Sequence, residues 1–421
     1  MTAVTSLLSA EQRAVLALWT EVNASLSAYH KLISNFGTAG LAWNAKVEAW
    51  RQLGIHSTHL KRHEQPEQTL TTIDKIQQAL LDGKYGLLFA DQPDYPAQLL
   101  EIYDPPPLLF YRGDKARLQQ AQIAIVGSRK PTAHAQKITF DMAQYLAQAG
   151  YIITSGLALG VDKRAHLGAL AQSDTEYQGR TIGVMGTGID VNYPNHHDKL
   201  FGQIIDQGGC IISELLPHTL PHKHTFPRRN RLVAGLSLAT IVTEATIQSG
   251  SLITARLTSE QGKQVFAIPS HIDNNNAEGC HHLIREGATL IYHPQQVLED
   301  INSQLGYQSR NYNSSDSTES HITQENSTQE SISQSSHSIN TDRTSTTTIS
   351  HAPQSNLKPS SHTSVIPEHL ALIYEQLDWH GQDLDALLNT TDMSAAQLIG
   401  QLMELELLGV ISVQGGRYLR V

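Results

Sequence analysis

Hydrophobic residues recur at helical spacing over the first part of the chain, up to about residue 65. Leu16, Trp19, Leu26 and Leu32 follow this spacing, and NFG at 35–37 interrupts it as a turn would. We therefore expect residues 1–65 to form a small helical domain, of the SAM-like or helix-hairpin-helix-like kind.

Between about residues 85 and 300, short continuous apolar runs alternate with helical segments. These runs are IAIVG, YIITSG, TIGVMG, CIISE, ATIVTE and VFAIP. Buried strands separated by helices are typical of a parallel sheet covered on both faces. The pattern predicts an α/β fold with a Rossmann-like, doubly wound, mostly parallel sheet over 85–300. In such sheets ligands bind at the carboxyl ends of the strands.

Two further segments follow the predicted sheet. Residues 306–364 are rich in Ser, Thr, Asn and Gln and hold almost no large apolar side chains, which predicts a disordered linker. Residues 365–421 show three helical segments and then two strand-like segments, the order of a winged helix. Its last helix carries Glu404 and Glu406 but no Lys or Arg. A DNA-reading domain and a partner-docking domain of this fold therefore both stay open.

Composition limits where charged ligands can bind. The chain has 421 residues and a formal net charge of −10, so any polyanion site must be local. The two cysteines, Cys210 and Cys280, are too few for a disulfide framework and favour a reducing compartment. The sequence shows no signal peptide and no apolar run long enough to span a membrane, so we expect a cytoplasmic protein without a membrane partner.

Several loops at the predicted carboxyl edge of the sheet suit an anion. Gly127-Ser128-Arg129 follows the first strand of the alternating series, where a nicotinamide cofactor would require GxGxxG. SGLALGVD at 155–162, GTGIDVNYP at 186–194 and SGSLITA at 249–255 follow later strands. Each could serve only as a helix cap, but four such loops at one edge predict an extended anion-binding surface.

FPRRNR, at 226–231, supplies arginines to this acidic chain. Interpreting it as a short loop before a helix, we expect Arg228 and Arg231 to face the predicted anion-binding edge together with Arg129. The alternatives are that Phe226 is a core residue and that Arg231 pairs with Glu214 or Glu244.

The order of these motifs resembles the DNA-processing protein A family (DprA, also called Smf). AIVGSR, TSGLALGVD, GTGIDVNYP, FPRRNRLVAGLS, TEATIQSGSLITA, VFAIP and GCHHLIREGA occur in family order between about residues 85 and 292. Helical N-terminal and winged-helix C-terminal extensions also occur in that family. Three positions depart from the family pattern: Val161 for Ile, Lys263 for Arg and Ser270 for Gly. None of these changes removes a polar group from the expected edge.

The middle arginine of FPRRNR varies in the family-like pattern, so we expect Arg229 to point to solvent. The resemblance also implies a binding protein without catalytic activity. Family members bind single-stranded DNA, self-associate through the sheet domain, and load RecA recombinase onto DNA coated by single-strand-binding protein during natural transformation. We therefore expect a homodimer with these partners. The expected DNA-binding residues are Gly127, Ser128, Arg129, Ser155, Gly156, Gly186, Gly188, Phe226, Arg228, Asn230, Arg231, Ser249, Gly250, Ser251 and Thr254.

Two alternatives to DNA binding, a hydrolase and a metal site, are less well supported by the sequence. A nucleotide or nucleoside-phosphate hydrolase could use the same fold, with Glu244 as a general acid or base. The PGG-GT glycine loop typical of that class is missing from SGSLITA. A metal site at His196-His197 or Cys280-His281-His282 is disfavoured, because adjacent side chains point in different directions and no second pair stands at ligand spacing. We expect neither a metal nor a cofactor.

Overall fold

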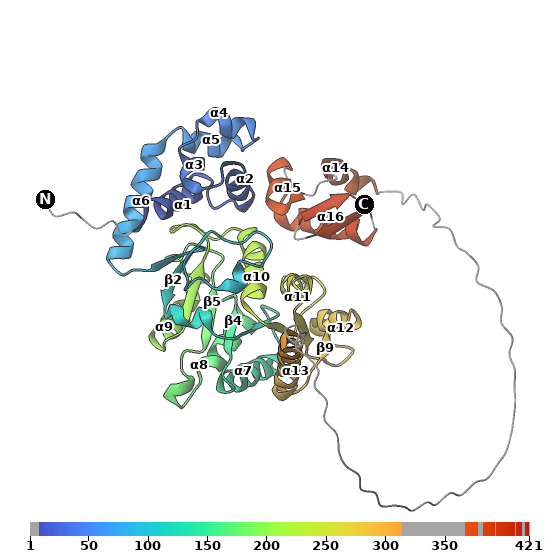
Figure 1. The fold of residues 1–421 in the computed structure, drawn as a ribbon. Helices are drawn as coiled ribbons and strands as arrows, with labels where there is room; N and C mark the ends of the chain where they lie inside the picture. Colours follow the sequence, from blue (N-terminus) through green and yellow to red (C-terminus); the bar gives the residue numbers. More distant parts are fainter. Residues whose placement is uncertain are drawn as a thin grey trace, which may run out of the picture.

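The chain forms a helical N-terminal domain, a sheet domain and a small C-terminal domain (Figure 1). The structure is a computed structural model. It describes residues 8–313, 367–377, 382–391, 393–408, 410–414 and 417–420. Most of the segment predicted to be disordered, from residue 314 to 364, lies outside these residues.

Six helices build the N-terminal domain. Ser9 starts the first of them with a capping box, in which its hydroxyl accepts from Gln12 N and the Gln12 side chain accepts from Ser9 N. The last helix carries the domain beyond the boundary predicted at residue 65. The helices are α1 (Ala10–Glu21), α2 (Leu26–Phe36), α3 (Ala39–Trp43), α4 (Val47–Gln52), α5 (Ser57–His63) and α6 (Pro66–Leu81).

A nine-stranded sheet forms the centre of the molecule, in the order β1-β2-β6-β5-β4-β3-β7-β8-β9. The strands from β6 to β9 in this order pair in parallel, while β2 pairs antiparallel with both β1 and β6. The fold-class prediction is confirmed. The strands are β1 (Gly86–Phe89), β2 (Leu108–Gly113), β3 (Gln122–Val126), β4 (Ile152–Ser155), β5 (Thr181–Val184), β6 (Cys210–Ser213), β7 (Ala239–Val242), β8 (Gln264–Ala267) and β9 (Thr289–Leu290).

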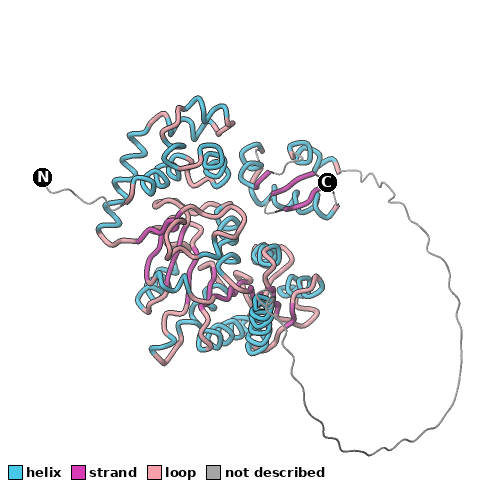
Figure 2. The backbone as a smooth tube through the Cα atoms, viewed as in Figure 1, coloured by secondary structure: helices cyan, strands magenta, loops and turns pink. Residues whose placement is uncertain are grey.

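Helices cover both faces of this sheet, so side chains of each strand alternate between two cores (Figure 2). On β3, Ile123 and Ile125 pack with α7, α8 and α13, whereas Ala124 and Val126 pack with α10, α11 and α12. The helices are α7 (Ala133–Gln148), α8 (Val161–Leu170), α9 (Asp198–Asp206), α10 (Thr225–Leu236), α11 (Ser251–Glu260), α12 (Glu278–Arg285) and α13 (Pro294–Asn313). Helix α13 thus includes the first residues of the segment predicted to be disordered.

The C-terminal domain has the winged-helix order. Its three-stranded sheet has the order β10-β12-β11, and the helices bury a core that includes Leu370, Leu387, Leu402 and Ile411. The elements are α14 (Glu368–Gln376), β10 (Gln382–Asp383), α15 (Leu384–Thr390), α16 (Ala395–Leu407), β11 (Ile411–Gln414) and β12 (Arg417–Arg420). No helix in the described ranges is long and apolar enough to cross a membrane.

The winged helix contacts the sheet domain beside α10 and α11 (Figure 1). Glu406 of α16 pairs with Arg256 of α11 at 3.0 Å. The guanidinium of Arg417 lies 5.6 Å from the centre of the Tyr103 ring. The helix that a DNA-reading winged helix would place in a groove therefore uses one of its two acidic side chains to hold this intramolecular contact.

A buried carboxylate ties three helices of the N-terminal domain together. Glu21 is fully buried and accepts hydrogen bonds from Trp43 Nε1 at 2.9 Å and from His63 Nδ1 at 2.7 Å. His63 Nε2 donates to Ala45 O at 2.8 Å, and its ring stacks on Trp50 with centroids 4.0 Å apart. Because both ring nitrogens face acceptors, His63 is an imidazolium here. Burial alone would lower the pKa of His63, but the hydrogen bond to Glu21 and the other acceptors raise it above its ordinary value.

This raised pKa predicts a specific pH dependence of stability. The charged pair contributes fully below the unfolded-state pKa, about 6.5, and its contribution is lost as pH rises through the higher folded-state pKa. His63→Gln should therefore lower the free energy of unfolding by about 1.5–3 kcal/mol near pH 6. Well above the folded-state pKa, the difference from wild type should shrink. Melting temperatures of both proteins between about pH 5.5 and 9 check this. Curves that stay parallel over the whole range would contradict the assignment.

Candidate functional site

Strands β3 and β7 mark the point where the strand order reverses, and their carboxyl ends open the crevice where ligands bind in doubly wound folds. The loops after them are fastened together, because Ser128 N donates to Glu244 O at 2.6 Å. At Gly127 an added Cβ would lie 2.7 Å from the same carbonyl oxygen, so this close approach requires glycine. The GSR turn predicted from sequence thus lies at the switch point.

Glu244 itself is committed to structure. The carboxylate is buried and accepts from Thr132 N at 2.9 Å and from Thr132 Oγ1 at 2.7 Å. Both of its oxygens therefore hold the N-terminus of α7, where a negative charge is stabilising. This arrangement gives no support to Glu244 as the general base of a hydrolase.

FPRRNR lies inside α10, which begins at Thr225. Thr225 Oγ1 donates to Gly186 O at 2.6 Å and anchors this first turn at the end of the β5 strand. A helix places residues three and four apart on one side. Phe226, Arg229 and Asn230 therefore share one side of α10, whereas Arg228 and Arg231 share another.

Arg229 is the arginine that lies against the strand ends. It is only 5% exposed, its Nη1 donates to Val184 O at 2.6 Å, and its guanidinium packs directly over Gly156. Burial lowers the pKa of Arg229 to about 10, and the nearby Asp162 opposes this shift. Our prediction that Arg229 points to solvent is wrong. Helical spacing from Phe226, rather than loop geometry, decides its direction.

Asp162 balances part of this charge from beneath the loop after β4. Its Oδ2 accepts from Gly156 N at 3.1 Å and from Ala158 N at 3.3 Å. Burial raises the pKa of Asp162, whereas Arg229, those amide hydrogen bonds and Arg129 lower it. Arg129 acts on both buried groups and is itself exposed, so it adds a cation at the surface of the same crevice.

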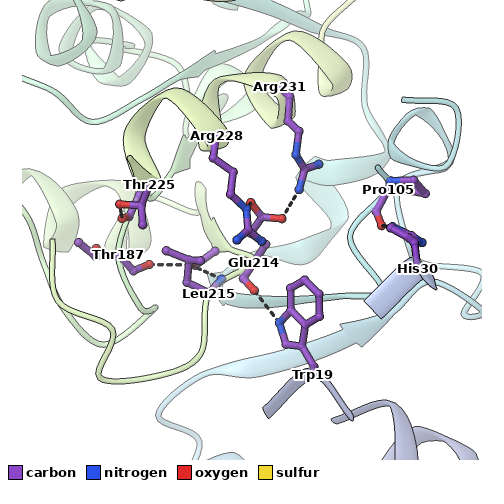
Figure 3. A network of polar contacts seen from close by, with 11 residues as sticks. Trp19, His30, Pro105, Thr187, Glu214, Leu215, Thr225, Arg228 and Arg231 are labelled. Carbon is purple, nitrogen blue, oxygen red and sulfur yellow. Dashed lines mark hydrogen bonds and ion pairs between the residues drawn. The ribbon is translucent and has the colours of Figure 1, made fainter. Parts of the chain in front are cut away.

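Arg228 and Arg231 turn the other way and share Glu214, as Figure 3 shows. Arg228 Nε donates to Glu214 Oε1 at 3.0 Å, and Arg231 Nη2 donates to Glu214 Oε2. All three side chains are at most 13% exposed. The prediction that Arg228 and Arg231 face the anion-binding edge is therefore wrong. Of the alternatives, the pairing of Arg231 with Glu214 is the one found.

The same network reaches the N-terminal domain. Trp19 Nε1 donates to Glu214 O at 2.9 Å, and the Arg228 guanidinium lies 5.9 Å from the centre of the Trp19 ring. Nearby, His30 Nε2 donates to Pro105 O at 3.0 Å (Figure 3). The carboxylate and carbonyl of one residue thus fasten α10 and α1 to the end of β6.

Several predicted site residues are packing residues. Ser155 is buried and donates to Ile125 O at 2.7 Å. An added Cβ on Gly186 would lie 2.7 Å from the Phe226 ring, and one on Gly188 would lie 2.6 Å from Leu216 O. Phe226 is half-buried between Gly186 and the ring of Tyr193, whose centroid is 5.4 Å away. Tyr193 belongs to the GTGIDVNYP loop but was not among the predicted DNA-binding residues, and it leaves 43% of its surface exposed beside Phe226.

The N-terminus of α11 completes the site. Ser249 Oγ and Ser251 Oγ lie 2.6 Å apart, and Asn230 Nδ2 donates to Gly250 O at 3.2 Å. Thr254 is buried one turn further on and does not reach the surface. We call residues 127–130, 156–160 and 249–252, with Arg229 beneath them, the rim. Of the residues predicted to bind DNA, the rim contains Gly127, Ser128, Arg129, Gly156, Ser249, Gly250 and Ser251, and Asn230 borders it through its bond to Gly250. Lys130 and Arg229 belong to the rim but were not predicted, and neither was Asp162, which lies beneath it.

A doubly wound sheet with glycine- and serine-rich loops and basic side chains at its switch point defines a Rossmann-like protein, here joined to a winged helix. The chain belongs to the DNA recombination-mediator protein A family. That family's model matches residues 86–302, and the DprA winged helix domain matches residues 358–417.

Individual relatives agree with this assignment. The chain is 40% identical to Protein Smf from Escherichia coli over 221 residues, 52% of this chain and 58% of Smf. It is 44% identical to DNA processing protein DprA from Streptococcus pneumoniae over 206 residues, 49% of this chain and 71% of that protein. The crystal structure of the pneumococcal DprA aligns with a TM-score of 0.58 and 32% identity, covering 68% of this chain and 97% of that one. The match to Smf thus spans little more than half of that relative's length.

The shared carboxylate makes a strong prediction for stability. Glu214→Gln keeps the shape of the side chain but leaves two mostly buried guanidiniums without a counter-charge. This should lower the free energy of unfolding by about 3–5 kcal/mol, measured by urea titration. Glu176→Gln, at an exposed glutamate, is the matched control and should unfold like wild type. Equal midpoints for the two variants would show that the ion cluster does not hold α10 in place.

Proposed function

We propose that this protein is a non-enzymatic recombination mediator that binds single-stranded DNA along the rim. The observation that carries the proposal is the convergence of Arg129, Lys130 and the buried Arg229 at the switch point of a chain with a net charge of −10. Family membership supports the same function. The commitment of Glu244 to Thr132 leaves the alternative hydrolase without its expected general base.

Each part of the rim suits a different part of a DNA strand. Arg129 and Lys130 are exposed and can pair with successive phosphates. Arg229 is fixed by Val184 O and adds a positive potential from below without losing side-chain entropy on binding. Phe226 and the exposed Tyr193 offer aromatic surface to unstacked bases, which contributes about 1–3 kcal/mol per stacked base. A duplex hides its base faces, so the site should favour single strands.

The family resemblance supplies the rest of the proposal. RecA recombinase is the proposed partner that is loaded onto the bound strand, with single-strand-binding protein as the protein displaced, in the cytoplasm of a transformable cell. Self-association through the sheet domain is proposed on the same ground. Exposed Leu290 on the edge strand β9 and Tyr292 just after it are compatible with such a contact.

Replacement of Arg129 tests the proposed site. Arg129→Glu removes one phosphate contact and adds repulsion above Arg229, so single-strand affinity should fall by about tenfold to a hundredfold. Fluorescence anisotropy with labelled oligothymidine, and with a duplex of equal length at matched salt, measures both affinity and preference. Wild-type affinity should also fall as salt rises, through counterion release.

Arg285→Glu is the matched control, since it makes the same charge change at an exposed site at the far end of α12. It should bind single strands within about twofold of wild type, because its charge lies outside the rim. If Arg129→Glu folds normally and binds like Arg285→Glu, the rim is not the DNA site. If wild type binds the duplex as tightly as the single strand, base stacking does not contribute.

A further inference from the structure

A second basic surface lies on the opposite side of the first turn of α10. There, a cavity of about 600 Å³ separates the N-terminal domain from the loop that leads into α10. Thr20 of α1, Arg62 of α5 and Thr69 and Thr72 of α6 form one wall. The other wall is formed by residues 215–220, His222, His224, Thr225 and Arg228.

The lining has the chemistry of a phosphate site. No aspartate or glutamate lines the cavity within the described residues, although the whole chain carries a net charge of −10. Four lining threonines, Thr20, Thr72, Thr219 and Thr225, donate their hydroxyls to main-chain carbonyls, so an anion would be held by the basic side chains. The cationic and imidazole side chains that line it are Arg62, His218, His222, His224 and Arg228.

The two arginines keep an excess of positive charge at this place. Glu214 is shared between Arg228 and Arg231, so one carboxylate faces two guanidiniums. Nη2 of Arg228 is buried and has no hydrogen-bond partner among the described residues. Arg62 Nη1 donates to Glu21 O at 3.3 Å, and this main-chain carbonyl satisfies the donor without neutralising its charge.

A carboxylate of the winged helix lies within electrostatic range of two of these side chains. Burial raises the pKa of Asp385 on α15, and Arg228 and His224 oppose this shift. Asp385 does not line the cavity, but it interacts electrostatically with Arg228 and His224, which do. Arg228 and His224 thus favour the charged form of a second carboxylate besides Glu214, although burial outweighs them.

The cavity continues the proposed DNA path. Phe226 and Arg229 face the rim, while His224, Thr225 and Arg228 face the cavity, so only the first turn of α10 separates the two surfaces. A helix is about 10 Å across, a distance that a flexible strand can cross without leaving the protein.

We propose that this cavity binds the sugar-phosphate backbone of single-stranded DNA that extends beyond the rim, so that the N-terminal domain forms part of the DNA-binding surface. This inference rests on the proposed function. It assigns Arg62, His222 and Arg228 as phosphate-facing groups, and it predicts a footprint longer than the rim alone.

Oligonucleotide length separates the two surfaces. A short oligothymidine of about 6 nucleotides fills the rim, and one of about 20 nucleotides also reaches the cavity. Arg62→Glu should weaken binding of the long oligonucleotide by about tenfold and leave binding of the short one unchanged. The slope of log affinity against log salt for the long one should fall by about 0.7 for each phosphate that the variant no longer neutralises.

Lys61→Glu is the matched control, because it makes the same charge change on the same helix at an exposed side chain outside the cavity. It should bind both lengths like wild type. His222→Glu serves as a second test, since His222 is exposed and its replacement should not affect folding. Its effect should follow that of Arg62→Glu, and melting temperatures of all variants identify any that unfold.

The outcomes distinguish this inference from the proposed function. Selective loss of long-oligonucleotide affinity in Arg62→Glu and His222→Glu supports the cavity. The cavity inference alone is overturned if both variants bind the long oligonucleotide like Lys61→Glu while Arg129→Glu still loses the short one. If wild type binds neither length, the proposed function fails and the cavity inference fails with it.

Discussion

The ion cluster of Glu214 with Arg228 and Arg231 is the constraint on which the rest of the site depends. Removing a carboxylate from water is unfavourable, and two guanidiniums at hydrogen-bond distance compensate for that cost. The same residue accepts from Trp19 through its main-chain oxygen, so one position holds β6, α10 and α1 together. Burial lowers the pKa of Arg231, and Glu214 opposes that change.

The rotation of α10 follows from this cluster. With Arg228 and Arg231 fixed toward Glu214, the side of the helix about 100° away must face the strand ends. That side carries Phe226 and Arg229. Arg229 then takes the space above Gly156 that only a residue without a side chain leaves free. The cluster thus fixes Arg229 beneath the rim, so that an acidic chain holds a positive charge there.

The sequence was sufficient to predict the sheet and the loops that surround the site. Buried strands such as IAIV at 123–126 are recognisable as continuous apolar runs. Parallel strands bring the loops that follow them to one edge of the sheet. GSR at 127–129 and SGS at 249–251 could therefore be placed at the same edge. Helix α6 was not predicted. Its signals were nevertheless present, with Pro66 at the first helical position and apolar residues at 70, 73 and 76.

The roles of the three arginines could not be predicted from the loop interpretation of FPRRNR. Pro227 is compatible with the helix, because proline is tolerated in the first turn, where its missing N–H would have no partner. Once α10 starts at Thr225, the three-residue spacing of Arg228 and Arg231 indicates a common side. Their partner Glu214 follows β6, and its contact with both arginines depends on how β6 and α10 pack together. No local sequence rule predicts that packing.

Hydrogen–deuterium exchange of the intact protein, with and without saturating oligothymidine, tests most directly whether the switch-point crevice is the DNA site. Amides of residues 127–130, 156–160 and 249–252 should gain protection when the oligonucleotide binds, because the bound strand would cover these loops. Protection confined to the winged helix, with these three loops exchanging as in the free protein, would contradict this assignment.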